Sequence, residues 1–176
     1  SQIGLVTKKF VLFGTDKSLP DGRIIATKGE AGFQAKTLAP GIYFGFWPWQ
    51  YEITLENFTV IPQGKIGLIS AKDGLVPSNG AILGRNVDSD NFQDAEKFLN
   101  NNGNKGRQST VLVSGSYRIN KFLFDVSITD QITINDNAVG IVTTLDGMPL
   151  SEGQIAADTA TGHNKFQDFN LFLENK

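Results

Sequence analysis

The feature that most constrains the fold is an internal repeat. A hydrophobic-Gly-hydrophobic run opens three stretches of the chain, and a turn signal follows each run. Self-similarity of this kind indicates a row of small modules rather than one large domain. The runs are Ile3-Gly4-Leu5-Val6, Ile66-Gly67-Leu68-Ile69 and Val139-Gly140-Ile141-Val142, and the turn signals are Leu19-Pro20-Asp21-Gly22, Lys72-Asp73-Gly74 and Leu145-Asp146-Gly147.

Further matches share one separation, 74 residues. Several matches at one separation predict three copies of one unit: a first module over residues 1–62, a second over 63–136 and a truncated third over 137–176. The matched segments are Gly32-Phe33-Gln34 with Gly106-Arg107-Gln108, Pro40-Gly41-Ile42-Tyr43 with Ser114-Gly115-Ser116-Tyr117, and Asn91-Phe92-Gln93-Asp94 with Lys165-Phe166-Gln167-Asp168.

Most of each module is predicted to be β-strand. Residues 122–129 alternate apolar and polar side chains, which places the apolar ones on one face of a strand. Residues 91–99 instead carry apolar side chains at helical spacing after an acidic or amide cap, Asp90 or Asn91, and residues 165–173 repeat the pattern. The expected fold is therefore mainly β (a β-rich α+β chain), with tandem small antiparallel β modules and short inserted helices.

Composition excludes several classes of function. The absence of Cys rules out a disulfide framework, a thiolate zinc site and a cysteine nucleophile. Sixteen Lys and Arg against eighteen Asp and Glu leave no positive surplus, so nucleic acid is not an expected partner. No run of 18 apolar residues is present, which predicts that this stretch of chain is soluble by itself.

Candidate metal and catalytic residues have simpler interpretations. Residues 88–94 place oxygen-bearing side chains at alternate positions, as a calcium loop does, but the mid-loop Gly and terminal Glu are out of place and a helix cap explains the acids. His163 has no second ligand at metal-binding spacing. No nucleophile elbow, phosphate loop or dinucleotide fingerprint occurs. We expect no enzyme, no catalytic residue, no metal and no cofactor.

The segment from Leu38 to Tyr51 is unusually aromatic. Alternation along a strand would place Phe44 and Phe46 on one face and the other rings on the opposite face, although Pro48 interrupts a regular ladder. In one interpretation the rings fill the β core and pack on the next module. In the other they form a surface that contacts a membrane or a partner. The six candidate contact residues are Tyr43, Phe44, Phe46, Trp47, Trp49 and Tyr51.

The same region carries a family resemblance. Leu38-Ala39-Pro40-Gly41-Ile42-Tyr43-Phe44, followed by Trp47-Pro48-Trp49 and preceded by Ile3-Gly4-Leu5-Val6, resembles the opening of an SPFH (band 7) domain of the flotillin-like branch, and the resemblance extends over about residues 3–130. It implies a non-enzymatic, membrane-associated scaffold whose anchor lies outside this stretch and which forms a homo-oligomer in the full-length protein. The modules also resemble the wall repeats of the major vault protein.

The resemblance and the aromatic residues leave two functions open. In the first, the chain is a scaffold region that organises membrane patches, with membrane lipid or neighbouring protomers as partners. In the second, it is a freestanding ligand-binding β module, for example for carbohydrate, in which Trp47, Trp49 and Tyr51 are stacking platforms exposed in a groove.

Overall fold

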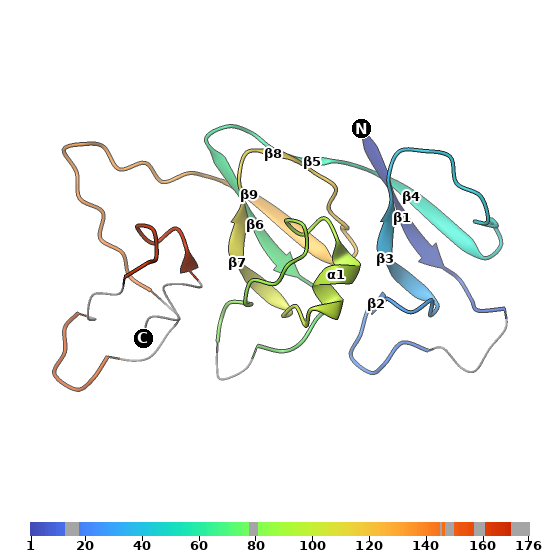
Figure 1. Cartoon of the computed structure of the whole chain (residues 1–176), viewed down its shortest axis with the longest axis horizontal. Coiled ribbons are helices and arrows are strands. Elements are labelled where there is room, and N and C mark those ends of the chain that lie inside the picture. The colour runs from blue at the N-terminus through green and yellow to red at the C-terminus, as the bar shows by residue number, and fades with distance from the viewer. Residues whose placement is uncertain (13–17, 78–80, 145, 147–149, 157–160, 170–176) are drawn as a thin grey trace.

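A computed structural model describes residues 1–12, 18–77, 81–144, 146, 150–156 and 161–169, and within them the protein is mainly β, as predicted (Figure 1). Two larger sheets lie next to each other along the long axis, and the described residues after β9 form no strand. The strands are β1 (Gln2–Lys8), β2 (Ile25–Ala26), β3 (Gly32–Leu38), β4 (Tyr51–Asn57), β5 (Thr59–Ile61), β6 (Lys65–Ala71), β7 (Gly106–Leu112), β8 (Gly115–Tyr117) and β9 (Phe124–Asp130).

The two larger sheets repeat one arrangement. The first has the order β2-β3-β1-β4, with β1 antiparallel to β3 and β4, and the second has the order β7-β6-β9, with β6 antiparallel to both neighbours. Gly4 lies opposite Leu38 and Leu55, while Gly67 lies opposite Leu112 and Ile128. The register also shifts at the same place, between Leu5 and Thr7 and between Leu68 and Ser70. The matched sequence runs therefore occupy the same positions in two sheets.

Close packing explains the Gly in each run. A Cβ atom added to Gly67 would lie 2.9 Å from Cδ1 of Ile61 and 3.2 Å from Cβ of Leu112. A Cβ atom on Gly4 would lie 3.0 Å from Ile53 and 3.2 Å from Leu38. A larger residue at either position would have to displace these apolar side chains, because such separations are shorter than ordinary contact distances.

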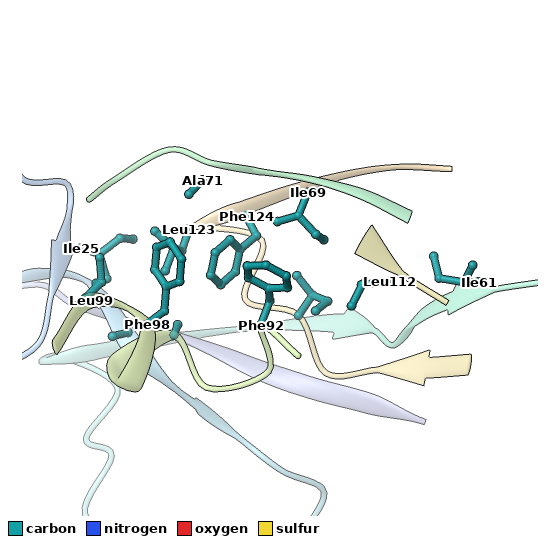
Figure 2. Packing of buried hydrophobic residues seen from close by; sticks show 13 residues of the cluster. Ile25, Ile61, Ile69, Ala71, Phe92, Phe98, Leu99, Leu112, Leu123 and Phe124 are labelled. Carbon is teal, nitrogen blue, oxygen red and sulfur yellow. The ribbon is translucent and has the colours of Figure 1, made fainter. Parts of the chain in front are cut away.

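One hydrophobic core spans the junction of the two sheets (Figure 2). Its centre is a group of three buried rings, Phe92, Phe98 and Phe124, whose centroids lie 5.0–6.1 Å apart in tilted and edge-to-face orientations. Ile25 and Ala35 of the first sheet belong to the same cluster. The first sheet therefore shares its buried surface with the second, as neighbouring units of a repeat protein do.

The helix is shorter than predicted. α1 covers Ala95–Asn100, and its N-cap is Asp94, whose side chain accepts the backbone N–H of Lys97 at 2.8 Å. The expected start at residue 91 and the expected Asp90 or Asn91 cap are wrong, because residues 90–92 have positive φ angles of 51–62° and form a left-handed turn. Phe92 nevertheless points into the core, as the spacing indicated.

The predicted start of the strand at residue 122 is also wrong, because residues 120–123 form a turn. The strand expected over residues 122–129 begins at Phe124, because the carbonyl of Asn120 accepts the N–H groups of Leu123 and Phe124 in a turn. Phe122 precedes the strand and stacks on Phe33 of the first sheet, with ring centroids 4.3 Å apart. It packs across the junction rather than within its own sheet.

The third module differs most from expectation. Residues 139–142 form no strand and are exposed, although they match the runs that form β1 and β6. Residues 164–166 repeat the left-handed turn, with φ angles of 44–63°, so the helix expected over 165–173 does not begin at residue 165. Residues 170–173 of that helix, and Leu145 and Gly147 of the third turn signal, lie outside the described residues. The predicted module boundaries stay predictions; the one after residue 62 falls in the turn between β5 and β6.

Candidate functional site

The aromatic segment is a loop that joins β3 to β4, not a strand. Gly45 has a φ of +87°, and the carbonyl of Trp47 accepts the N–H groups of Gln50 and Tyr51 at 2.9 and 2.8 Å, which closes a turn around Pro48. The expected alternation of the rings on two strand faces is therefore wrong. Pro48 is accommodated in this turn, where no ladder hydrogen bond is needed from its nitrogen.

Most of the aromatic side chains are open to solvent. Phe44 is 90% exposed, Trp49 60%, Trp47 55% and Tyr43 45%, whereas Phe46 and Tyr51 are half-buried. The interpretation in which the rings fill the β core is contradicted for the four exposed residues. We call the set Tyr43, Phe44, Phe46, Trp47, Trp49 and Tyr51 the aromatic surface.

The rings of the aromatic surface support one another. Trp47 and Trp49 stack with centroids 5.1 Å apart and planes 13° apart. Phe46 lies between two edge-to-face neighbours, Tyr51 at 5.2 Å and Tyr43 at 6.4 Å. Such pairs add to the energy of apolar burial and hold the ring orientations. Five of the six rings therefore have a ring neighbour, whereas Phe44 has none among the ring contacts of the described residues.

A buried amide fixes the base of the loop. The carbonyl of Gln50 accepts the N–H of Lys9 at 2.7 Å, and its side-chain Nε2 donates to the carbonyl of Phe10 at 3.4 Å. The Nζ of Lys9 donates to the carbonyl of Pro48 at 3.4 Å, and the Nζ of Lys8 lies 6.0 Å from the centre of the Tyr51 ring. Lys8, the last residue of β1, and the adjacent Lys9 therefore border the aromatic surface.

Sequence reasoning missed two neighbours of this loop. Phe10 and Leu12 follow β1 and are 40% and 52% exposed. Gln50 holds the backbone at Lys9 and Phe10 against the base of the loop through long-range bonds, for which no local sequence pattern exists. Figure 1 shows the β3–β4 loop on the side of the first sheet that faces away from β6, β7 and β9.

Two hollows lie elsewhere, at the junction of the sheets. One, of about 230 Å³, lies between β3 and α1 and contains Lys36, Asp94 and Arg118 in its wall. The other, of about 260 Å³, is bordered by Arg23 and Glu30. Both are polar and are smaller than the roughly 300–1,000 Å³ typical of small-molecule sites. Neither includes a residue of the aromatic surface.

The three acidic residues of segment 88–94, Asp88, Asp90 and Asp94, have protein partners. Asp88 pairs with Lys97 at 2.5 Å, and this hydrogen bond lowers the pKa of Asp88 and raises the pKa of Lys97.

His163 has a structural role in the third module. Its Nδ1 atom accepts the N–H of Phe166 at 2.8 Å, just as Ser89 Oγ accepts the N–H of Phe92 at 3.3 Å in the second module. His163 therefore closes a turn. Within the described ranges no three His, Cys, Asp or Glu side chains form a group that could hold a metal ion.

Comparisons with known proteins add no relative: no protein-family model, curated protein or solved structure matches the chain. Among the residues that the structure describes, no helix has the length and apolar character needed to cross a membrane.

Proposed function

We propose that the chain is a non-enzymatic, membrane-associated scaffold region that oligomerises to organise membrane patches, in the manner of flotillin-like SPFH proteins. The observation that supports it best is the exposure of Phe44, Trp47 and Trp49 in one loop. Large rings exposed together are unusual on a monomeric protein and mark surfaces that contact a membrane or another protein.

The chemistry of the aromatic surface suits a membrane interface. Trp and Tyr rings are preferred at the boundary between headgroups and hydrocarbon, because one part of each ring is apolar and another forms hydrogen bonds. Lys8 and Lys9 border the surface and supply positive charge for anionic headgroups. A lipid bilayer or a neighbouring protomer is the partner that this surface would contact.

Flotation with vesicles tests the membrane contact. Wild-type protein should float with phosphatidylcholine vesicles that contain phosphatidylserine, and a Trp47→Ala/Trp49→Ala variant should float several-fold less. Ile155→Ala removes a side chain that is 98% exposed but distant in sequence, and this matched control should float like wild type. Wild-type protein that stays with the unbound fraction at low ionic strength would contradict membrane contact.

A carbohydrate-binding module is the second candidate, because Trp47 and Trp49 are exposed as stacking platforms would be. The two rings stack on each other, so only their outer faces are open to a sugar. Titration with oligosaccharides, followed by Trp fluorescence, separates this candidate from the first. Saturable quenching that disappears in both single Trp→Ala variants would favour the carbohydrate function.

A further inference from the structure

The turn at the base of the aromatic loop has a counterpart in the second module. In each turn one carbonyl accepts the N–H groups three and four residues later: Trp47 at 2.9 and 2.8 Å, and Asn120 at 3.0 and 2.8 Å. In each module a lysine donates its N–H to this turn at 2.7 Å, and its Nζ to the carbonyl that follows Trp47 or Asn120, at 3.4 and 2.9 Å. The two turns therefore match residue by residue. The matched pairs are Lys9 and Lys72, Phe10 and Asp73, Trp47 and Asn120, and Trp49 and Phe122.

In the second module three of these positions hold the first module. Asn120 donates to two carbonyls of β3 at 3.0 and 2.9 Å, and Phe122 stacks on Phe33 with ring centroids 4.3 Å apart. Asp73 accepts the N–H of Ile25 in β2 and that of the residue before it, both at 2.8 Å. This side of the second module is therefore a docking face, and its amide and carboxylate recognise backbone groups of the neighbouring module.

The first module carries rings at the same three positions. Phe10 replaces the carboxylate, Trp47 replaces the amide and Trp49 replaces the phenyl ring, and all three residues are exposed. We call these three residues the end face. The difference from the second module lies in residue type, so it does not depend on which neighbours are present. The hydrogen bonds that hold the first module to the second could not form here, and a buried backbone group left without its partner costs about 1–3 kcal/mol.

The end face lies at one end of the molecule. Figure 1 shows the β3–β4 loop, which carries both Trp residues, at the end of the long axis that lies away from the second and third modules. Lys8 and Lys9 border the rings and place positive charge beside them. A flat partner that contacts these rings would therefore meet the first module, and the other two modules would lie at increasing distances from its surface.

We propose that the end face contacts an anionic lipid bilayer and that the row of modules stands upright on it, with only the first module touching lipid. A bilayer presents no row of backbone N–H and C=O groups, so rings suit it better than a carboxylate and an amide do. Trp rings are preferred between headgroups and hydrocarbon, and Lys8 and Lys9 supply charge for anionic headgroups. This inference rests on the proposed function and adds the orientation of the modules.

Intrinsic fluorescence tests the contact, because the two Trp residues of the chain, Trp47 and Trp49, both belong to the end face. Their emission should shift to the blue with vesicles of phosphatidylcholine and phosphatidylserine, and brominated lipids should quench it several-fold. Phe10→Asp/Trp47→Asn gives the end face the polar residues of the docking face and keeps Trp49 as the reporter. Quenching should fall several-fold in this variant, with circular dichroism unchanged. Ile141→Asp, at an exposed position of the third module, is the control and should be quenched like wild type.

Energy transfer to the membrane tests the orientation. Because the chain contains no Cys, a donor dye can be attached at Ile42→Cys, Val113→Cys or Ile141→Cys, three exposed positions in the first, second and third modules. Vesicles with an acceptor dye on their headgroups then report the height of each module. Transfer should be strongest from the first module, weaker from the second and weakest from the third. A row that lies flat on the bilayer would give similar transfer from all three positions.

The possible failures can be told apart. Similar transfer from all three labels, or flotation of wild-type protein without quenching of its Trp residues, would overturn this inference and leave membrane association intact. Quenching of Phe10→Asp/Trp47→Asn equal to that of wild type would also overturn it. Wild-type protein that does not float would refute the proposed function as well. A blue shift on raising the protein concentration without lipid, together with faster sedimentation, would assign the end face to a second copy of the chain instead.

Discussion

The Oδ2 atom of Asp73 accepts the backbone N–H of Ile25 at 2.8 Å, although Ile25 lies in the first sheet and Asp73 follows β6 of the second. The same oxygen accepts the N–H of Ile24 at 2.8 Å, and Oδ1 lies 3.0 Å from Nε of Arg23. Asp73 is buried, and its carboxylate therefore joins the first module to the second by hydrogen bonds that apolar contact cannot replace.

The third module repeats this junction. The Oδ2 atom of Asp146 accepts the N–H groups of Ile82 and Leu83 at 3.0 and 3.2 Å. Asp73 and Asp146 are the Asp residues of two Asp-Gly turn signals. The sequence predicts reversal of a strand at these pairs, whereas the structure uses their carboxylates to hold the preceding module. Docking of adjacent modules is thus encoded in one repeated side chain.

Replacement of Asp73 by Ala should weaken this junction. The change leaves the part-buried N–H of Ile24 and the buried N–H of Ile25 without their acceptor, and an unpaired buried donor costs about 1–3 kcal/mol. We expect the free energy of unfolding in urea to fall by about 3 kcal/mol. Asp130→Ala breaks only the exposed pair with Lys65 and should cost less than about 1 kcal/mol. Equal effects of the two variants would refute the role of Asp73.

Asn120 offers a second test at the junction. Its Nδ2 donates to the carbonyls of Gln34 and Ala35 at 3.0 and 2.9 Å, and its Oδ1 accepts the N–H of Phe122 at 3.0 Å. Asn120→Asp removes both donated bonds and places a buried carboxylate against two carbonyl oxygens. We expect a loss of about 3 kcal/mol or more at neutral pH, with partial recovery in acid as the carboxylate protonates. A stability unchanged between pH 4 and 7 would argue against this account.

Gly103 should not tolerate a side chain. An added Cβ atom would lie 2.4 Å from the ring of Phe98, which is fully buried in the core. Gly103→Ala should therefore cost about 1–3 kcal/mol through overpacking. Gly64→Ala is the matched control, because nothing lies within 4 Å and only its φ of +78° opposes a side chain, at about 1–2 kcal/mol. Near-ultraviolet circular dichroism should change only in the Gly103 variant, since only that change disturbs a core ring.

The carboxyl of Glu30 should make the stability of the protein depend on pH. Burial raises the pKa of its carboxyl, but the backbone N–H groups of Glu30, Lys28 and Thr27 outweigh burial and hold the pKa below its usual 4.5. A lowered pKa contributes stability above about pH 4.5, which disappears as the pH falls through the folded-state value. The stability difference between wild type and Glu30→Gln in urea should be constant near neutrality and shrink below pH 4.5. A difference that grows in acid would contradict the assignment.

Short patterns predicted the candidate site only in part. The clustering of Trp47 and Trp49 in sequence identified the aromatic surface, but alternation assigned the wrong backbone to it. A period-2 pattern cannot be distinguished from a loop when Gly45 and Pro48 interrupt it, since both residues favour turns. Burial was also not predictable, because the exposure of each ring depends on which distant residues pack against it, and a local pattern does not identify them.

The sequence by itself determined the repeat, the mainly β fold and the Gly positions of β1 and β6, because these follow from residue type and spacing along the chain. Tertiary structure decided the rest. Only the packing of two sheets makes Asp73 a junction residue, buries Phe92 in a shared core and leaves Trp47 and Trp49 exposed in the β3–β4 loop. The physical reason is that strand pairing and burial join residues far apart in the chain, and local patterns record which residues can pair but not which partners are present.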